Sequence, residues 1–95
     1  MPIDYLVQWT GDGSAADRVI ALAFPARAVV VVGYLVTDFG QTVILVWLNG
    51  LAFTATPGGA SNPQMTTDIR PDPGGFIVAA SANQLSWRYT AVVWS

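Results

Sequence analysis

The chain has 95 residues, of which 53% are hydrophobic and 11% are charged, and this length suits one small domain with one core. Its ionisable side chains are six Asp, four Arg and three Tyr, so it has neither a basic patch for nucleic acid nor any Cys for disulfides. The longest apolar run is far shorter than the roughly twenty residues of a membrane span, and the N-terminus MPIDYLVQW lacks the positive charge of a signal peptide.

The low content of charged residues bears on how the surface of the protein is covered. A typical soluble domain has about a quarter of its residues charged, and large apolar patches are uncommon on monomers. We therefore expect a homo-oligomer in which much of the surface faces other protein. The alternative is a monomer with a polar exterior built from Thr, Ser, Gln, Asn and Gly.

Alternating hydrophobicity and turn-forming residues divide the chain into about eight short strands. In chain order these are residues 4–9, 18–22, 28–35, 42–48, 51–56, 65–69, 76–80 and 85–94. Clusters of Gly, Pro, Asp, Asn and Ser separate them, with turns expected at residues 37–40 and 70–75 and the longest loop at residues 57–63. No stretch sustains the period of a helix.

Two features in the first half of the chain are informative. Residues 28–35, AVVVVGYL, are rich in β-branched side chains and predict a strand buried on both faces. Asn49 and Gly50 lie between two apolar strands and predict a type I′ hairpin turn, because both residues tolerate a positive φ.

The last stretch, residues 74–95, organises the rest of the chain. A polar break at residues 81–84 divides it, and we expect its two halves to pair as a hairpin that ends in a long C-terminal strand. One face of that strand carries Leu85, Trp87, Tyr89, Ala91 and Val93. Because this face is apolar, it needs a second sheet to cover it. The sequence therefore predicts an all-β fold, a small antiparallel β-sandwich of jelly-roll type, as a single domain over residues 1–95.

Residue types that carry most enzyme chemistry are missing from this chain. It has no His, Cys, Lys or Glu, so no Ser-His-Asp or Cys-His arrangement can form. Paired Asp side chains could serve a glycosidase, but all six Asp lie in or next to predicted turns, where Asp has a structural reason to be. We predict a protein that is not an enzyme, with no catalytic residue and no cofactor.

Oxygen ligands in two loops raise the possibility of a calcium site. The candidate ligands are Asp12, Ser14 and Asp17 in one loop and Asp68 and Asp72 in another. Neither loop has the spacing or the bidentate Glu of an EF-hand. We favour turn chemistry at Asp12-Gly13 and an Asp17 that lies beside Arg18, and we predict no metal site.

The aromatic residues suggest two kinds of contact. Exposed rings can stack on sugars, and Trp47, beside the expected turn at Asn49, is the candidate glycan contact. The interpretation we prefer is that the rings fill the core and an interface. Because large aromatics and Arg dominate interfaces, the candidate interface residues are Trp94, Arg88, Tyr34 and Phe53.

Two segments of the chain together resemble a known family. The first contains the run WTGDG at residues 9–13, the strand RVIALAFP at residues 18–25 and the apolar residues 28–32. The second contains GFIV at residues 75–78, Asn83 and YTAVVW at residues 89–94. This order is similar to that of the small β-sandwich domain that recurs in tailed-bacteriophage virion proteins. Pro25 follows Phe24 directly, where the family has a residue between, and residues 36–72 carry no family signature.

The resemblance implies a non-enzymatic virion structural protein, typically trimeric. Such domains occur at tail-fibre tips and in capsid-associated proteins. The chain starts close to the domain and shows no stem, which suits a capsid decoration or cement protein on the major capsid protein. The expected location is the virion, after synthesis in the host cytoplasm, with no nucleic-acid or membrane partner.

Two alternatives remain open at this stage. The chain could instead be a tail-fibre or head-fibre module that binds a host receptor or glycan. An unrelated secreted β-sandwich is disfavoured by the lack of a signal peptide.

Overall fold

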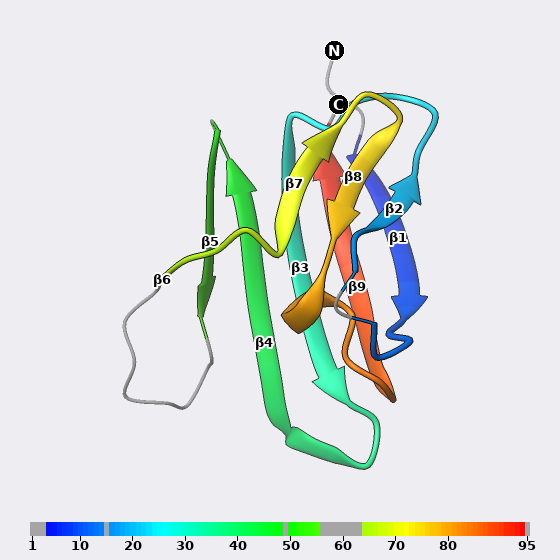
Figure 1. Cartoon of the computed structure of the whole chain (residues 1–95), viewed down its shortest axis with the longest axis vertical. Helices are drawn as coiled ribbons and strands as arrows, with labels where there is room; N and C mark the ends of the chain where they lie inside the picture. The colour runs from blue at the N-terminus through cyan, green and yellow to red at the C-terminus, as the bar shows by residue number, and fades with distance from the viewer. Residues whose placement is uncertain (1–3, 15, 49, 56–63, 95) are drawn as a thin grey trace.

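The computed structural model describes residues 4–14, 16–48, 50–55 and 64–94, and it places their strands in two antiparallel sheets (Figure 1). Sheet A contains β1 (Asp4–Thr10), β9 (Trp87–Trp94), β3 (Ala28–Leu35), β4 (Asp38–Leu48), β5 (Leu51–Ala55) and β6 (Gln64–Met65), in that order. Sheet B contains β2 (Arg18–Ala21), β8 (Gly75–Val78) and β7 (Ile69–Asp72), in that order. A short 3-10 segment, η1 (Ala80–Ala82), is the one helical element of the described chain.

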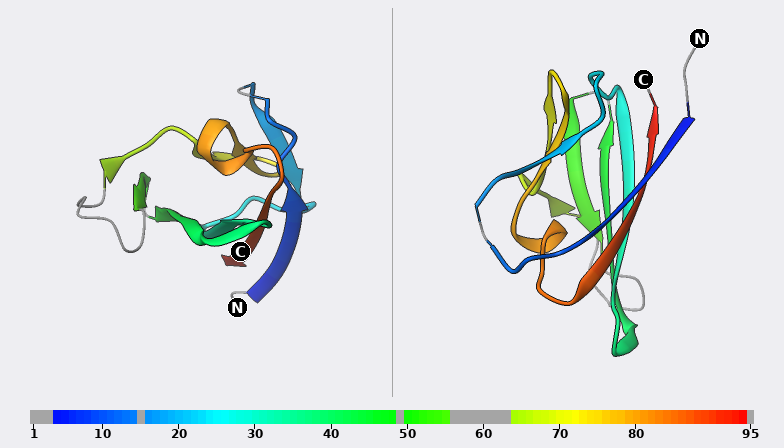
Figure 2. Two further views of the ribbon diagram at one scale, coloured as in Figure 1. Left: turned by 90° about the horizontal axis from the view of Figure 1, so that it is seen from below. Right: turned by 90° about the vertical axis from the view of Figure 1, so that its right-hand side faces the viewer.

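The two sheets face each other as layers, and the prediction of a small all-β sandwich is confirmed. The right-hand view of Figure 2 shows sheet B and η1 on one side of sheet A. The described part of the chain forms nine strands, where the sequence predicted about eight. The extra strand arises because the expected strand at residues 65–69 is two separate strands, β6 and β7.

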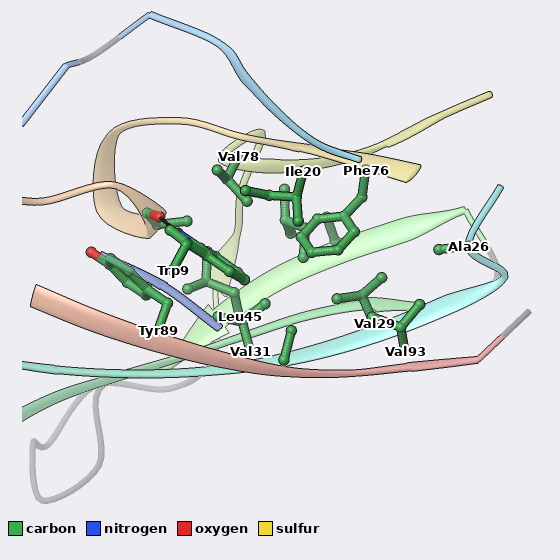
Figure 3. Packing of buried hydrophobic residues seen from close by; sticks show 14 of the residues in the cluster. Trp9, Ile20, Ala26, Val29, Val31, Leu45, Phe76, Val78, Tyr89 and Val93 are labelled. Atoms are coloured by element: carbon green, nitrogen blue, oxygen red, sulfur yellow. Dashed lines mark hydrogen bonds between the residues drawn. The ribbon is translucent and has the colours of Figure 1, made fainter. Parts of the chain in front are cut away.

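The core lies between the sheets and is built from alternate residues of each strand (Figure 3). Strand β9 follows the expected alternation from Trp87 to Val93, whose odd-numbered residues are buried. Leu85, expected on the same face, lies before the strand and is 68% exposed. Sheet B contributes the facing side chains of Ile20, Phe76 and Val78. The apolar face of the C-terminal strand is therefore covered by a second sheet, as predicted.

The predicted C-terminal hairpin is wrong, because β8 and β9 lie in different sheets. Strand β8 pairs with β2 and β7, and β9 pairs with β1 and β3. The polar break between them is a crossover that contains η1, with positive φ at Ala80 and at Ser86. Both strands carry an apolar face, and facing each other across the core buries more of those faces than pairing side by side would.

Three further boundaries differ from expectation. Strand β4 begins at Asp38, because a turn at Val36-Thr37 and an irregularity after Tyr34 replace the turn expected at residues 37–40. The turn expected at residues 70–75 is reduced to Pro73-Gly74. Pro71 lies within β7, where it is tolerated because β7 is an edge strand of sheet B.

The strand at residues 28–35 has the predicted bounds, but only one of its faces is buried. Val29 and Val31 are fully buried, whereas Val32 is 41% exposed. The prediction of burial on both faces is therefore wrong for this chain taken by itself. Asn49, half of the expected hairpin turn, and the loop expected at residues 57–63 lie outside the described residues.

Candidate interaction surface

The face of sheet A that points away from sheet B is apolar over most of its width. Antiparallel register places outward side chains in rows across the strands. The middle row comprises Leu6, Val92, Val30, Val46, Phe53 and Met65. The row on one side comprises Trp94, Ala28, Leu48 and Leu51, with Asp4 in register at its β1 end. In the row on the other side Val32, Ile44 and Ala55 are apolar, and this row continues into the polar Thr90 and Gln8. We call these three rows the apolar outer face.

This face holds much of the exposed apolar surface of the described chain. Leu6 is 63% exposed, Leu51 is 56% exposed and Met65 is 68% exposed. Val32, Leu48 and Val92 are also exposed. Single exposed apolar residues are ordinary on protein surfaces, but a contiguous group of them marks an interaction site.

The apolar outer face has a shallow depression near its end at β4 and β9. The depression has a volume of about 360 Å³ and is lined by Ala28, Val30, Val46, Trp47, Leu48 and Trp94. Its floor is low because Ala28 and Val30 are small, and larger side chains stand around it. A concave apolar site of this kind suits a single large side chain from another molecule.

The opposite end of the same sheet face is polar, and we call it the polar end. It comprises Gln8, Thr10, Arg88, Thr90, Tyr34 and Thr42. A pocket of about 270 Å³ lies there, lined by all of these except Thr42 and also by Trp9 and Tyr89. The Gln8 side-chain amide donates to the Thr90 hydroxyl at 3.3 Å. Arg88 is the one charged group among the described side chains of this face.

The four predicted interface residues come together on this one face. Trp94 and Phe53 belong to the apolar outer face, and Arg88 and Tyr34 are paired at the polar end. The predicted glycan contact, Trp47, belongs by register to the other face of sheet A, because its cross-strand partner is the buried Val29. Its side chain is half-buried and packs against the core, although the residue also lines the depression.

Sequence reasoning missed most of the apolar outer face. The signal that could have found it is the absence of a polar face in the strands at residues 28–35 and 42–48. There the even-numbered residues are as apolar as the odd-numbered ones. A strand with two apolar faces was interpreted as buried within the sandwich, whereas its second face lies on the outside.

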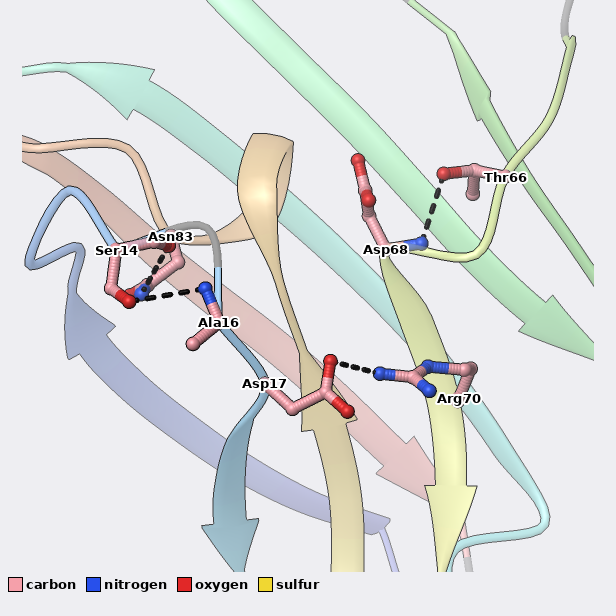
Figure 4. A network of polar contacts seen from close by, with 7 residues as sticks. All are labelled: Ser14, Ala16, Asp17, Thr66, Asp68, Arg70 and Asn83. Atoms are coloured by element: carbon pink, nitrogen blue, oxygen red, sulfur yellow. Dashed lines mark hydrogen bonds and ion pairs between the residues drawn. The ribbon is translucent and has the colours of Figure 1, made fainter.

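The loop that carries the candidate calcium ligands is held by hydrogen bonds within the protein (Figure 4). The buried Asn83 side chain accepts from the Asp12 N–H at 3.2 Å and from the Arg18 guanidinium at 3.1 Å. Its amide nitrogen donates to the Asp12 carboxylate and, at 3.2 Å, to the Ser14 carbonyl. Asn83 therefore uses both of its polar atoms to lock this loop onto the crossover before β9.

Three of the candidate carboxylates, those of Asp12, Asp17 and Asp72, have structural partners. The Ser14 N–H donates to the Asp12 carboxylate at 2.9 Å, and this bond is the main reason that the pKa of Asp12 lies below its ordinary value. Asp17 pairs with Arg70 rather than with the expected Arg18. Asp72 accepts from the Gly74 N–H at 3.0 Å, which is turn chemistry as predicted for these residues. Among the described residues, no group of three or more acidic side chains is placed to hold a metal ion.

The two segments that carry the family resemblance are neighbours in space. Strand β1 pairs with β9, and β2 pairs with β8. The Gly11 N–H donates to the Trp87 carbonyl at 2.9 Å, and the Gly13 N–H donates to the Asn83 carbonyl at 2.9 Å. A side chain at Gly11 would collide with the backbone of Gln84, so the turn glycine is required by close packing.

No protein-family model, curated protein or solved structure matches this chain. The described residues contain no helix that is long and apolar enough to cross a membrane.

Proposed function

We propose that this chain is a non-enzymatic structural protein of a bacteriophage virion, a decoration or cement protein that assembles as a trimer on the capsid. The observation that carries the proposal is the apolar outer face of sheet A. It is apolar except for Asp4 at its β1 end, contiguous and uncovered in the single chain, which is the property of a protein that functions in an assembly. The terminal motifs supply the virion context, because they resemble those of phage β-sandwich domains.

The non-enzymatic part of the proposal is supported by the roles of the titratable groups. The carboxylates of Asp12, Asp17 and Asp72 are engaged with backbone N–H groups or with Arg70. The polar pocket is lined by amide, hydroxyl, aromatic and guanidinium groups and has no carboxylate among its lining residues. Such a pocket offers donors for binding, and its lining holds no His, Cys, Asp or Glu that could act as a general base.

A cement protein needs one surface for its own copies and another for the shell. The apolar outer face suits the first role, because it presents a largely apolar surface to a partner. The remaining surface, which includes sheet B, carries the polar and charged residues of the described chain and would contact the shell at its symmetry axes. A closed arrangement of copies would bury the apolar surface and leave a soluble particle component.

The second candidate function is receptor or glycan binding by a fibre module, and the polar pocket favours it. Arg88, Tyr34 and Gln8 line this pocket and offer a guanidinium, a phenol and an amide side by side. Sugar hydroxyls and carboxylates pair well with such groups. A glycan array probed with the wild-type chain and with Arg88→Ala tests this function, which requires specific binding that the substitution abolishes.

The proposed function is tested on purified particles of the virus that encodes the chain. We expect the chain in stoichiometric amount, as density at symmetry axes of the capsid in an electron-microscopy map. Particles that lack the chain should lose their genome at a lower temperature and recover when purified chain is added back. Absence from particles would refute the proposal, and density at the tail alone would favour the fibre module.

A further inference from the structure

We propose that the apolar outer face of sheet A is covered by the same face of another copy of this chain. This inference deepens the proposed function, on which it rests for the expectation of an assembly, by naming the partner of the face. The partner is a second copy, and the contact is sheet on sheet. The argument depends on the area, the charge and the shape of the face.

The outer face has the size of one side of a stable interface. At the usual strand spacing and rise, each outward residue occupies about 33 Å² of sheet, so the apolar outer face covers about 400 Å² and the polar end about 200 Å². A standard interface buries about 800 Å² of accessible surface on each partner. Accessible surface exceeds projected area because side chains project from the sheet, so the whole outer face matches that size.

The charge of the face selects a partner that also carries little charge. The three rows hold one ionisable residue, Asp4, which the register places at the β1 end of a row, and burying an unpaired charge against the apolar residues would be unfavourable. An ordinary protein surface, with about a quarter of its residues charged, is a poor match. The same face of another copy is a good match, because it offers the same β-branched and aliphatic side chains.

The shape of the face suits packing of two sheets. Sheets pack about 10 Å apart with interdigitated side chains, and the middle row of Val30, Val46 and Val92 gives such a surface. Trp94 stands at the wall of the depression that Ala28 and Val30 leave low. A large side chain from the facing copy would fill this depression, and the polar end with Arg88 would form the solvated rim.

The first experiment measures the mass of the purified full chain by light scattering at micromolar concentration. We expect twice 10.1 kDa, or a larger even multiple, for the wild type, because contact of a face with the same face pairs the copies. Val32→Arg should give the mass of one chain, because an unpaired buried charge weakens association by at least about 100-fold. Val19→Arg is the matched control, since Val19 is 53% exposed on β2 of the other sheet and the substitution should leave the mass unchanged.

A second measurement covers the case in which Val32→Arg fails to fold. The chain has no Cys, so a single introduced thiol reports on its site without interference. Leu48→Cys should react with a maleimide much more slowly in concentrated than in dilute protein, whereas Val19→Cys should react at the same rate in both. A rate for Leu48→Cys that does not change with protein concentration would overturn the inference, as would a wild type with the mass of one chain.

The outcomes separate this inference from the proposed function. An oligomer that Val32→Arg dissociates supports the inference even if the chain is absent from particles, which would refute the virion role alone. A chain found on the capsid as separate single copies would refute the inference alone. Contact of a face with the same face pairs copies two by two, so a mass of two chains supports the inference and replaces the trimer of the proposed function. A mass of three chains agrees with the proposed trimer and would overturn the inference.

Discussion

The ring of Tyr89 lies across Gly33, its cross-strand partner on β3, and occupies the space that a side chain at position 33 would need. Trp9 stacks on the same ring with centroids 5.4 Å apart, and the Gln84 N–H donates to the Tyr89 hydroxyl at 2.8 Å. A glycine inside a strand is unfavourable by itself. Here it makes room for the largest fully buried side chain of the core.

Gly33→Ala should therefore destabilise the protein by about 1–3 kcal/mol, because the added methyl group forces the packed Tyr89 ring to move. Gly74→Ala is the control, since a side chain there would meet only an ordinary contact with Asp72, and it should change stability by less than about 0.5 kcal/mol. Urea unfolding followed by Trp fluorescence at one fixed protein concentration measures both. Equal midpoints for the two variants would contradict the role of Gly33.

Asn83→Ala should cost about 1–3 kcal/mol of stability, because it leaves the Asp12 N–H, the Ser14 carbonyl and Arg18 without their buried partner. Ser14→Ala, in the same loop, removes only an exposed hydroxyl that accepts from the Ala16 N–H and should have a much smaller effect. Hydrogen exchange should show faster exchange at Gly11 and Gly13 in the Asn83 variant. Unchanged protection of both amides would contradict the role of Asn83 in holding the loop that contains Asp12 and Ser14.

Asp12 should contribute to stability in a way that depends on pH. The hydrogen bond from Ser14 lowers the pKa of Asp12 in the folded state below 3.8, so in acid the unfolded state binds the proton first. The stability that this pKa shift contributes is present above pH 3.8 and is lost as the pH falls through the lower pKa of Asp12 in the folded state. The melting temperature of the wild type minus that of Asp12→Asn should shrink between pH 5 and pH 2, and a constant difference would contradict this.

Tyr89 should act in the opposite pH range. Burial is the main cause that raises the pKa of Tyr89 above 10.0, so at high pH the unfolded state releases its proton first. The stability that this pKa shift contributes is complete below pH 10.0 and is lost as the pH rises through the pKa of Tyr89 in the folded state. Tyr89→Phe should be about 1 kcal/mol less stable at pH 7, because the Gln84 N–H loses its acceptor. The difference in melting temperature between the wild type and Tyr89→Phe should become smaller above pH 10.

Calcium should have no effect on stability at millimolar concentration. Three of the candidate ligands already have partners. Asp12 accepts from the Ser14 N–H and from the Asn83 amide, Asp17 pairs with Arg70, and Asp72 accepts from the Gly74 N–H. Melting curves with added CaCl₂ and with chelator should coincide. A rise in the melting temperature that chelator reverses would show that these carboxylates leave their partners for a metal ion.

Patterns with a period of two made the strands predictable from the sequence. The faces of β9 and the bounds of β3 follow from alternation and from β-branched residues, because side-chain direction in a strand is a local property of the backbone. The turn roles of Asp12 and Asp72 were predictable for the same reason, since a short polar side chain finds backbone N–H groups two residues away.

Only the tertiary structure decided which strands pair and which apolar face lies outside. The sequence suggested a hairpin of β8 and β9, but they pair in different sheets, because pairing partners are set by which faces meet across the core and not by order in the chain. The same applies to Trp94, Arg88, Tyr34 and Phe53, which come from the three strands β9, β3 and β5 and are aligned on one sheet face by register. The alternation of side chains along a strand assigns each residue to one of two faces, and the packing of one sheet on the other determines which face remains uncovered.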